Sequence, residues 1–275
     1  MTSREPVDIA AIRAAVANPN GPYARVDYTA FTGSTNADLV AAGHQNAPAW
    51  TAVVTEYQNS GRGRHGRVWT APKGSQVTLS ILIRPTAESI ERLGTMPLVS
   101  GLAIIDALTA TAARHPDATD KLTPQLKWPN DVLIDGRKLC GILAEAVSLG
   151  PEPAVVIGLG VNVSITTEEL PVPHATSLDL EAPGIEIDRA QLTADVLLAL
   201  HHRINQWVDA DPQLMADYRA VCSSIGADVK VLLPGDEELL GTVRDVADDG
   251  RLVVVDKQGS EHVLAAGDVT HLRLQ

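Results

Sequence analysis

The residues best suited to bind an anion lie at positions 61–69, where the sequence reads GRGRHGRVW. Three arginines alternate with glycines here, although the chain carries a formal net charge of −12. Three glycines in six positions oppose a helix, since each lowers helix propensity by about 1 kcal/mol. Glycine lets backbone N–H groups approach an anion, and a guanidinium can donate two parallel hydrogen bonds to carboxylate or phosphate. We therefore expect an anion-binding loop in which only Val68 and Trp69 favour burial.

Other interpretations of this arginine–glycine segment (residues 61–69) stay open when it is taken alone. It lacks the Gly-Lys-Ser/Thr ending of a P-loop, which argues against a Walker-type ATPase. Arginine–glycine segments also bind RNA, although these are usually longer and repeated. A mobile surface loop without function fits equally well. The acidic charge of the whole chain argues against general binding to nucleic acid or to a membrane surface.

A second group of candidate residues forms the KWPND segment (residues 127–131). The segment ends one predicted strand and begins the next. The bulky Trp128 and the rigid Pro129 restrict the neighbouring Lys127. A lysine held in this way is suited to neutralise a carboxylate and a phosphate at once. Asn130 and Asp131 alone favour a simple turn, because their side chains hydrogen-bond to nearby backbone.

Polar side chains also gather at the start of a predicted helix, at Ser34, Thr35 and Asn36. One hydroxyl is explained by helix capping, and the others are suited to meet a polar ligand head group. Residues 158–162 (GLGVN) fail the dinucleotide-binding pattern because residue 163 is Val. Glycines inside a strand instead indicate close approach of a ligand or a neighbouring backbone.

Several other possible sites are set aside. Ser148 lies in a degenerate nucleophile elbow, but Pro151 and Pro153 prevent the helix that a serine hydrolase needs. The pair His201-His202 has no partners spaced for zinc, so we expect a solvated pair on a helix. The cysteines, Cys140 and Cys222, lie in apolar surroundings that favour buried thiols.

The remaining sequence predicts a large region of helices and strands followed by a small all-β one. Helices are expected over 8–17, 34–42 (with Gly43 at C′), 97–113, 192–208 and 212–222, and strands over 23–31, 52–57, 77–83, 126–128, 132–134, 138–148 and 154–163. Asp135-Gly136 favours a type I′ hairpin turn. Five short strands are then expected over 229–233, 240–246, 251–256, 261–264 and 269–274, as in a small barrel. We place a domain boundary near residue 225, giving domains 1–225 and 226–275.

Targeting signals are not evident. The N-terminal residues lack the apolar region of a signal peptide. The longest apolar stretch, 97–113, contains Asp106 and is short for a membrane span. A cytoplasmic protein is expected.

Together these motifs resemble those of the biotin–protein ligases. The resemblance extends over most of residues 30–180 and includes, in the family's order and spacing, GSTN (33–36), Gln58, GRGRHGRVW, KWPND, GRKLCGIL (136–143), residues 158–163 and ATSL (175–178). It implies an α+β fold: a mixed, largely antiparallel sheet with helices, as in class II synthetases. The C-terminal strands resemble the small SH3-like β-barrel of these ligases.

The resemblance also implies an activity and roles for individual residues. The family activates biotin with ATP to biotinoyl-5′-AMP and transfers it to a lysine of a biotin carboxyl carrier protein. By the family pattern the catalytic residues are Arg62, Arg64 and Lys127; biotin is bound by Ser34, Thr35, Asn36, Gln58, Arg62, Gly63, Arg64 and Lys127; and ATP or adenylate by Arg67, Trp69, Lys127, Asn130 and Asn162. Mg²⁺ is expected to arrive with ATP, without a dedicated protein metal site.

Some family members carry a helix-turn-helix domain and repress transcription. Only about thirty residues precede GSTN here, so we expect a monofunctional ligase that binds neither DNA nor membranes. The oligomeric state stays open. The adenylate is labile, so residues 60–68 are expected to order over it and exclude water. A lipoate or octanoate ligase, an RNA-binding protein and a biotin-sensing regulator remain as alternatives.

Overall fold

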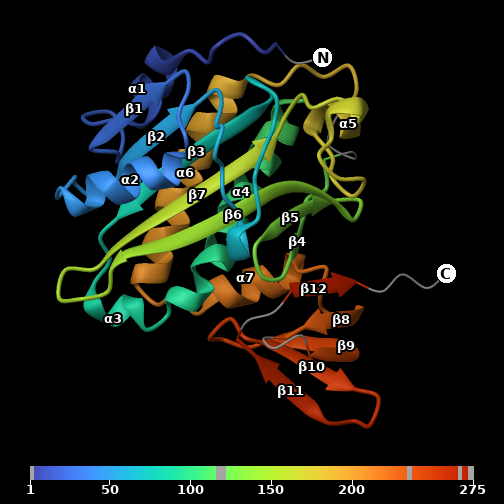
Figure 1. Cartoon of the computed structure of the whole chain (residues 1–275). Coiled ribbons are helices and arrows are strands. Elements are labelled where there is room, and N and C mark those ends of the chain that lie inside the picture. The colour runs from blue at the N-terminus through green and yellow to red at the C-terminus, as the bar shows by residue number, and fades with distance from the viewer. Residues whose placement is uncertain (1–2, 116–121, 234–236, 266–267, 272–275) are drawn as a thin grey trace.

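The computed structural model describes residues 3–115, 122–233, 237–265 and 268–271, and it has two β-sheets with helices around the larger one (Figure 1). The larger sheet has seven strands in the order β1 (Arg25–Thr29), β2 (Thr51–Thr55), β3 (Gln76–Ile83), β7 (Ala154–Asn162), β6 (Arg137–Ser148), β5 (Asp131–Ile134) and β4 (Gln125–Lys127). Only the β1–β2 pair is parallel, and every other neighbouring pair is antiparallel. The expected mixed, largely antiparallel sheet is confirmed.

Helices cover both faces of this sheet. The long helices α4 (Met96–Arg114) and α6 (Arg189–Val208) pack together on one face, with α1 (Ile9–Val16) against α6. The shorter α2 (Thr35–His44) covers the other face against β3 and β7. Every residue of β3 and β7 is therefore buried, including the polar Gln76, Thr78 and Ser80 of β3 and Asn162 of β7. The remaining helices are α3 (Ala87–Ile90), α5 (Leu178–Glu181) and α7 (Gln213–Val221).

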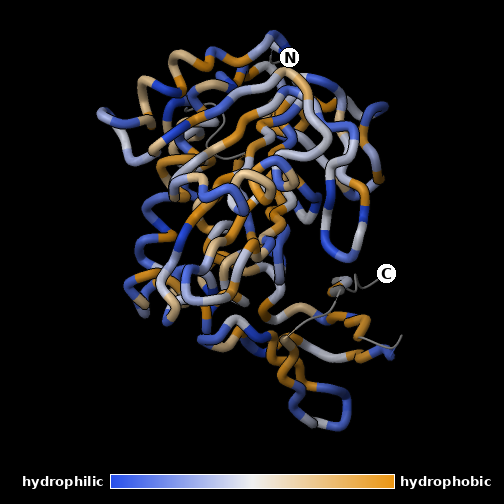
Figure 2. Tube along the Cα trace, turned by 60° about the vertical axis from the view of Figure 1, so that its left-hand side comes forward, coloured by the Kyte–Doolittle hydropathy of each residue, from blue (hydrophilic) through white to orange (hydrophobic). Residues whose placement is uncertain are grey.

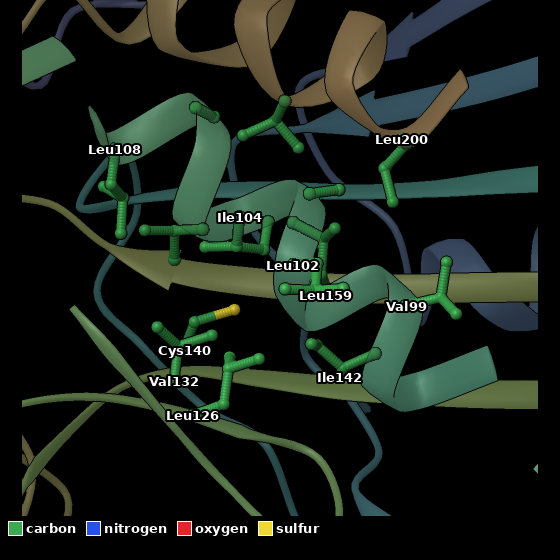
Figure 3. Packing of buried hydrophobic residues seen from close by; sticks show 14 of the residues in the cluster. Val99, Leu102, Ile104, Leu108, Leu126, Val132, Cys140, Ile142, Leu159 and Leu200 are labelled. Atoms are coloured by element: carbon green, nitrogen blue, oxygen red, sulfur yellow. The ribbon is translucent and has the colours of Figure 1, made fainter. Parts of the chain in front are cut away.

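The main core lies between α4, α6 and the sheet. Figure 3 shows Val99 and Leu102 of α4 facing side chains of the sheet that include Ile142 and Leu159. Apolar segments gather in the interior and hydrophilic ones on the outer loops (Figure 2). The stretch Leu93–Arg114 is long and apolar enough to cross a membrane, but 67% of its most apolar window is buried inside this core. Its apolar character is therefore accounted for by packing.

The smaller sheet is antiparallel and has the order β11 (Glu261–Leu264), β10 (Leu252–Asp256), β9 (Glu238–Val246), β8 (Asp228–Leu232) and β12 (Asp268–His271). It matches the five short strands expected for an SH3-like unit. Residues 272–274 of the last predicted strand lie outside the described residues. The buried side chains of this sheet join the same hydrophobic cluster as those of the larger one.

Turn chemistry was predicted correctly at one place and wrongly at another. Asp135 and Gly136 both have positive φ, 49° and 71°, which confirms the tight hairpin turn. The prediction of Gly43 at the C′ position of α2 was wrong, because the helix continues to His44 and Asn46 takes the left-handed conformation with φ 59°. Gly43 instead lets α2 approach β6, since a Cβ there would lie 3.2 Å from Val147 Cγ1.

Candidate active site

The start of α2 forms a buried polar cluster with the residues that follow β2. Ser34 caps the helix, as expected from the sequence. The backbone N–H and the hydroxyl of Thr35 both donate to Gln58 Oε1, at 2.7 and 3.0 Å. The Ser80 hydroxyl on β3 lies 2.7 Å from Thr35 Oγ1. Hydroxyl and amide groups at one helix N-terminus can match the donors and acceptors of a small polar ring.

The amide of Asn36 is held by residues of β3 and β6. Its Nδ2 donates to Glu145 Oε2 at 2.6 Å and to the Leu143 carbonyl at 3.4 Å, while its Oδ1 lies 2.6 Å from the Ser80 hydroxyl. A Cβ at Gly158 would lie only 1.8 Å from Oδ1, so this glycine makes room for the amide. The close approach predicted at Gly158 is thus made by a side chain of the protein.

The arginine–glycine segment folds as a short hairpin, which we call the arginine hairpin (residues 61–69). The Trp69 N–H donates to the Gly61 carbonyl at 2.9 Å, and the Gly63 N–H donates to the Arg67 carbonyl at 2.7 Å. Its tip, Arg64–Gly66, is a 3₁₀ turn with positive φ at His65 and Gly66. A Cβ at Gly61 would lie 2.4 Å from the Trp69 carbonyl oxygen, so the base of the hairpin requires glycine.

The predicted burial of Val68 was wrong. Its side chain is 77% exposed, and it pairs with Arg62 across the hairpin on the solvent side. Arg62 and Arg67 are exposed as well, and Trp69 is half-buried. The hairpin therefore presents its arginines to solvent from a base anchored at Trp69.

Trp69 begins a hydrogen-bond chain that ends at Thr176. Its Nε1 donates to Gln76 Oε1 at 3.2 Å, Gln76 Nε2 donates to Asn162 Oδ1 at 2.6 Å, and Asn162 Nδ2 donates to the Thr176 carbonyl at 2.7 Å. The indole occupies the space that side chains at positions 141 and 160 would need. A Cβ at Gly141 would lie 2.8 Å from the indole, and a Cβ at Gly160 would lie 2.5 Å from it. The structure thus connects the predicted residues Trp69 and Asn162 through Gln76, which sequence reasoning missed.

Lys138 is a second residue that sequence reasoning missed, although it lies within the quoted GRKLCGIL motif. Its Nζ is 2.6 Å from Asp131 Oδ1 and 5.5 Å from the centroid of the Trp69 ring. It therefore joins the KWPND segment to the base of the arginine hairpin.

The KWPND segment connects β4 to β5 and contacts the arginine hairpin at its tip. Asn130 is fixed by β6, since its Nδ2 donates to the Ile142 carbonyl at 2.8 Å. Its Oδ1 accepts a hydrogen bond from Arg64 Nη1 at 3.4 Å. Lys127 is the half-buried last residue of β4. The two segments that carry Arg62, Arg64 and Lys127 are far apart in sequence and thus meet at one edge of the larger sheet.

Among the described residues, no group of three or more His, Cys, Asp or Glu side chains could hold a metal ion.

Both cysteines are buried, as expected, and burial raises the pKa of the Cys140 thiol to about 12. The expectation of two solvated histidines was wrong for His201, whose ring centroid lies 4.5 Å from that of Trp50. Burial lowers the pKa of His201, so it packs as a neutral ring.

Comparisons with known proteins identify relatives along most of the chain. Residues 28–162 match the model of the biotin/lipoate A/B protein ligase family, and residues 224–272 match that of the biotin protein ligase C-terminal domain. The chain is 41% identical over 271 residues to a biotin–[acetyl-CoA-carboxylase] ligase of Mycobacterium tuberculosis, covering 98% of this chain and 97% of the relative. It is 30% identical over 205 residues to the bifunctional ligase/repressor BirA of Escherichia coli, covering 74% of this chain and 61% of the relative.

Solved structures share the fold. A biotin protein ligase from Aquifex aeolicus in complex with biotin and ATP has a TM-score of 0.73 and 24% identity, covering 92% of this chain and all of that one. A biotin protein ligase from Leishmania major in complex with biotinyl-5-AMP has a TM-score of 0.62 and 23% identity, covering 89% of this chain.

Proposed function

Because the chain belongs to the biotin protein ligase family, we propose that it activates biotin with ATP and transfers the biotinoyl group to a biotin-dependent carboxylase. The relative from Mycobacterium tuberculosis, named for this reaction, covers nearly the whole chain. A carboxylate oxygen of biotin attacks the α-phosphorus of ATP, and pyrophosphate leaves. The amine of an acceptor lysine then attacks the acyl carbon of biotinoyl-5′-AMP, loses a proton, and AMP leaves.

The observation that best supports this function is the contact between the arginine hairpin and the KWPND segment. The biotin carboxylate and the α-phosphate repel each other unless fixed cations lie beside both. The Arg64–Asn130 hydrogen bond holds the arginine hairpin against the KWPND segment, which carries Lys127. Arg62, Arg64 and Lys127 are proposed to neutralise the two anions as they meet. Cations placed in advance do not have to reorganise during the reaction.

The biotin head group is proposed to bind at the start of α2. Ser34, Thr35 and Gln58 offer hydroxyl and amide groups to the ureido ring, and the Gly63 backbone is proposed to face the carboxylate. Asn36 is proposed to shape the wall of this site, because Ser80, Glu145 and Leu143 hold its amide.

The nucleotide is proposed to bind beside Trp69. The indole is suited to stack on adenine, Asn130 and Asn162 are proposed to contact the nucleotide, and Arg67 on the exposed hairpin is suited to the phosphates. Mg²⁺ is proposed to arrive with ATP and to neutralise part of the charge of the leaving pyrophosphate.

The arginine hairpin is proposed to close over the adenylate and exclude water until the acceptor lysine arrives. Closure should protect residues 60–68 from proteolysis when biotin and ATP are saturating. Cleavage in the hairpin at an unchanged rate would contradict this role.

The partner is proposed to be the biotin carboxyl carrier domain of a carboxylase, in the cytoplasm. That the chain binds neither DNA nor membranes stays a prediction.

The function is tested by ATP–pyrophosphate exchange with biotin, lipoate and octanoate offered in parallel. Exchange with biotin is expected, and Lys127→Ala should reduce it by about 100-fold, since removal of one preorganised charge-stabilising group has effects of this size. Lys257→Ala is the control, because Lys257 is an exposed residue in the turn between β10 and β11. Exchange with lipoate alone would overturn the proposed function, and full activity of Lys127→Ala would overturn the role of Lys127.

A further inference from the structure

Trp128, the residue after Lys127, is buried against the C-terminal sheet. Its side chain is 2% exposed, and its Nε1 donates to the carbonyl of Gly250 at 2.9 Å. Its backbone N–H donates to Ser224 Oγ at 3.1 Å, also within the buried interior. Both donors of Trp128 are therefore satisfied by residues far along the chain.

Leu126, the residue before Lys127, is held by the same part of the molecule. Its carbonyl accepts hydrogen bonds from the Ser223 N–H at 2.8 Å and from the Ser223 hydroxyl at 3.0 Å. Leu126 also forms an isolated β-bridge with Cys222. Lys127 thus lies between two fixed residues. Leu126 is held by the segment that leads into the C-terminal sheet, and Trp128 is held by that segment and by the β9–β10 turn.

The carbonyl that binds Trp128 belongs to a turn with little freedom to move. Gly250 lies between β9 and β10 with φ 82°, a conformation that disfavours other residues. A Cβ at this position would lie 2.9 Å from Thr95 Cγ2 and 3.1 Å from Leu98 Cδ1. Arg219 of α7 holds the same turn, since its Nε donates to the Val246 carbonyl at 2.7 Å. Figure 1 shows the C-terminal sheet beside α7.

We propose that Trp128 is a positioning residue for adenylation, and that the β9–β10 turn of the C-terminal sheet (residues 247–250) fixes Lys127 through it. This rests on the proposed function of Lys127. A cation that must lie between two anions acts only when it is fixed there, and small displacements of a reacting group are costly in rate. The C-terminal sheet is therefore a support of the active site.

The first test replaces Trp128 with Phe, which keeps an aromatic ring but removes the N–H donor. We expect kcat for ATP–pyrophosphate exchange to fall about tenfold, with a smaller change in the KM for ATP. Tyr23→Phe is the matched control. Tyr23 is fully buried, and its variant also keeps an aromatic ring but loses a hydrogen bond to a backbone carbonyl, 2.7 Å to that of Leu197 on α6. Equal kcat values for the two variants, at a temperature where both are folded, would overturn the proposal.

The second test moves the turn while Trp128 stays intact. Gly250→Ala should lower kcat to a similar extent, because the added Cβ displaces the turn from Thr95 and Leu98. Gly259→Ala has the same backbone strain, since Gly259 has φ 83°, but its added Cβ meets nothing within 4 Å. Its kcat should therefore be unchanged. A kcat for Gly250→Ala as high as that for Gly259→Ala would contradict the proposal.

The third test separates positioning from general destabilisation. In single-turnover adenylate formation, Trp128→Phe should slow the reaction about tenfold in the native background and less than twofold in the Lys127→Ala background, where no lysine is left to position. An equal fold-loss in both backgrounds would overturn the proposal. A native rate for Lys127→Ala alone would instead overturn the proposed function of Lys127, so the two failures can be distinguished.

Discussion

At the scale of single residues, two glycines on β7 shape the two halves of the site. Gly158 admits the amide of Asn36, and Gly160 admits the indole of Trp69. The two residues are two positions apart on one strand, so they face the same side of the sheet. A side chain at either position would displace one neighbour and leave the other in place.

We therefore predict that two neighbouring substitutions affect different substrates. Gly158→Ala should raise the KM for biotin, and Gly160→Ala the KM for ATP, each by about tenfold, since overpacking costs about 1–3 kcal/mol and 1.4 kcal/mol is a factor of ten. Steady-state kinetics with each substrate varied in turn measures this. Gly94→Ala is the control, because a Cβ there meets nothing within 4 Å. If both variants raised the same KM, the assignment of the two subsites would be wrong.

The motif residues could be found from the sequence, but their supports could not. Ser34, Gln58 and Trp69 stand in contiguous motifs with chemistry of their own. Ser80 and Glu145 reach Asn36 only because the sheet places β7 between β3 and β6, and this strand order is not written in any local pattern. Val68 was misjudged for a similar reason, since its exposure depends on pairing with Arg62 in the hairpin.

At the scale of elements, the segment before α1 is bonded to residues near the proposed nucleotide site. Arg4 forms a salt bridge with Glu169 at 2.6 Å, and the Val7 N–H donates to Glu56 Oε1 at 2.7 Å. Glu56 also binds Arg189 of α6 at 2.8 Å, in a pair that is almost completely buried. Arg189 Nη1 in turn donates to the backbone carbonyl of Gln76 at 3.2 Å.

The Arg4–Glu169 pair predicts a dependence of stability on pH. The hydrogen bond from Arg4 lowers the pKa of Glu169 from 4.5 to about 2. A carboxyl group whose pKa is lowered by folding stabilises the folded protein at pH values above its unfolded pKa. This stabilisation is lost as the pH falls through the pKa of the folded protein. The melting temperature of the native protein should therefore drop more steeply from pH 4.5 to 2 than that of Glu169→Gln. Glu168→Gln, at an exposed neighbour, should follow the native curve; a Glu169→Gln curve parallel to the native one would contradict the prediction.

Elements were predicted well where one signal dominated. Asp8 and Ser34 begin helices as expected, because a capping side chain acts within three residues of itself. The end of α2 was missed because Gly43 had two possible uses, as a helix terminator or as a small residue in an interface. The packing of β6 against α2 decided between them.

At the scale of the whole molecule, one hydrophobic cluster spans the boundary expected near residue 225. Trp128 and Leu126 belong to it together with Val229, Val246 and Leu252 of the C-terminal sheet. Domains that share a core do not unfold independently, although their strands can be delimited in the sequence.

The full chain should therefore unfold in a single cooperative transition. Calorimetry should give one endotherm, with a van't Hoff enthalpy equal to the calorimetric enthalpy. Gly250→Ala should lower the midpoint of this one transition, because it disturbs the shared core. Two resolved transitions in the native protein, or in Gly250→Ala alone, would show that the sheets are energetically separate.

The hydrogen bond from Trp128 to Gly250 also sets an order of events during synthesis. A ribosome makes Lys127 long before it makes the carbonyl that holds the neighbouring indole, since 122 residues separate donor and acceptor. Ser34, Gln58 and Gly158 all precede the end of β7, so these residues of the proposed biotin site are synthesised first. A nascent chain that ends at β7 does not yet contain the carbonyl that holds Trp128. We therefore expect efficient adenylation only after residue 250 has left the ribosome.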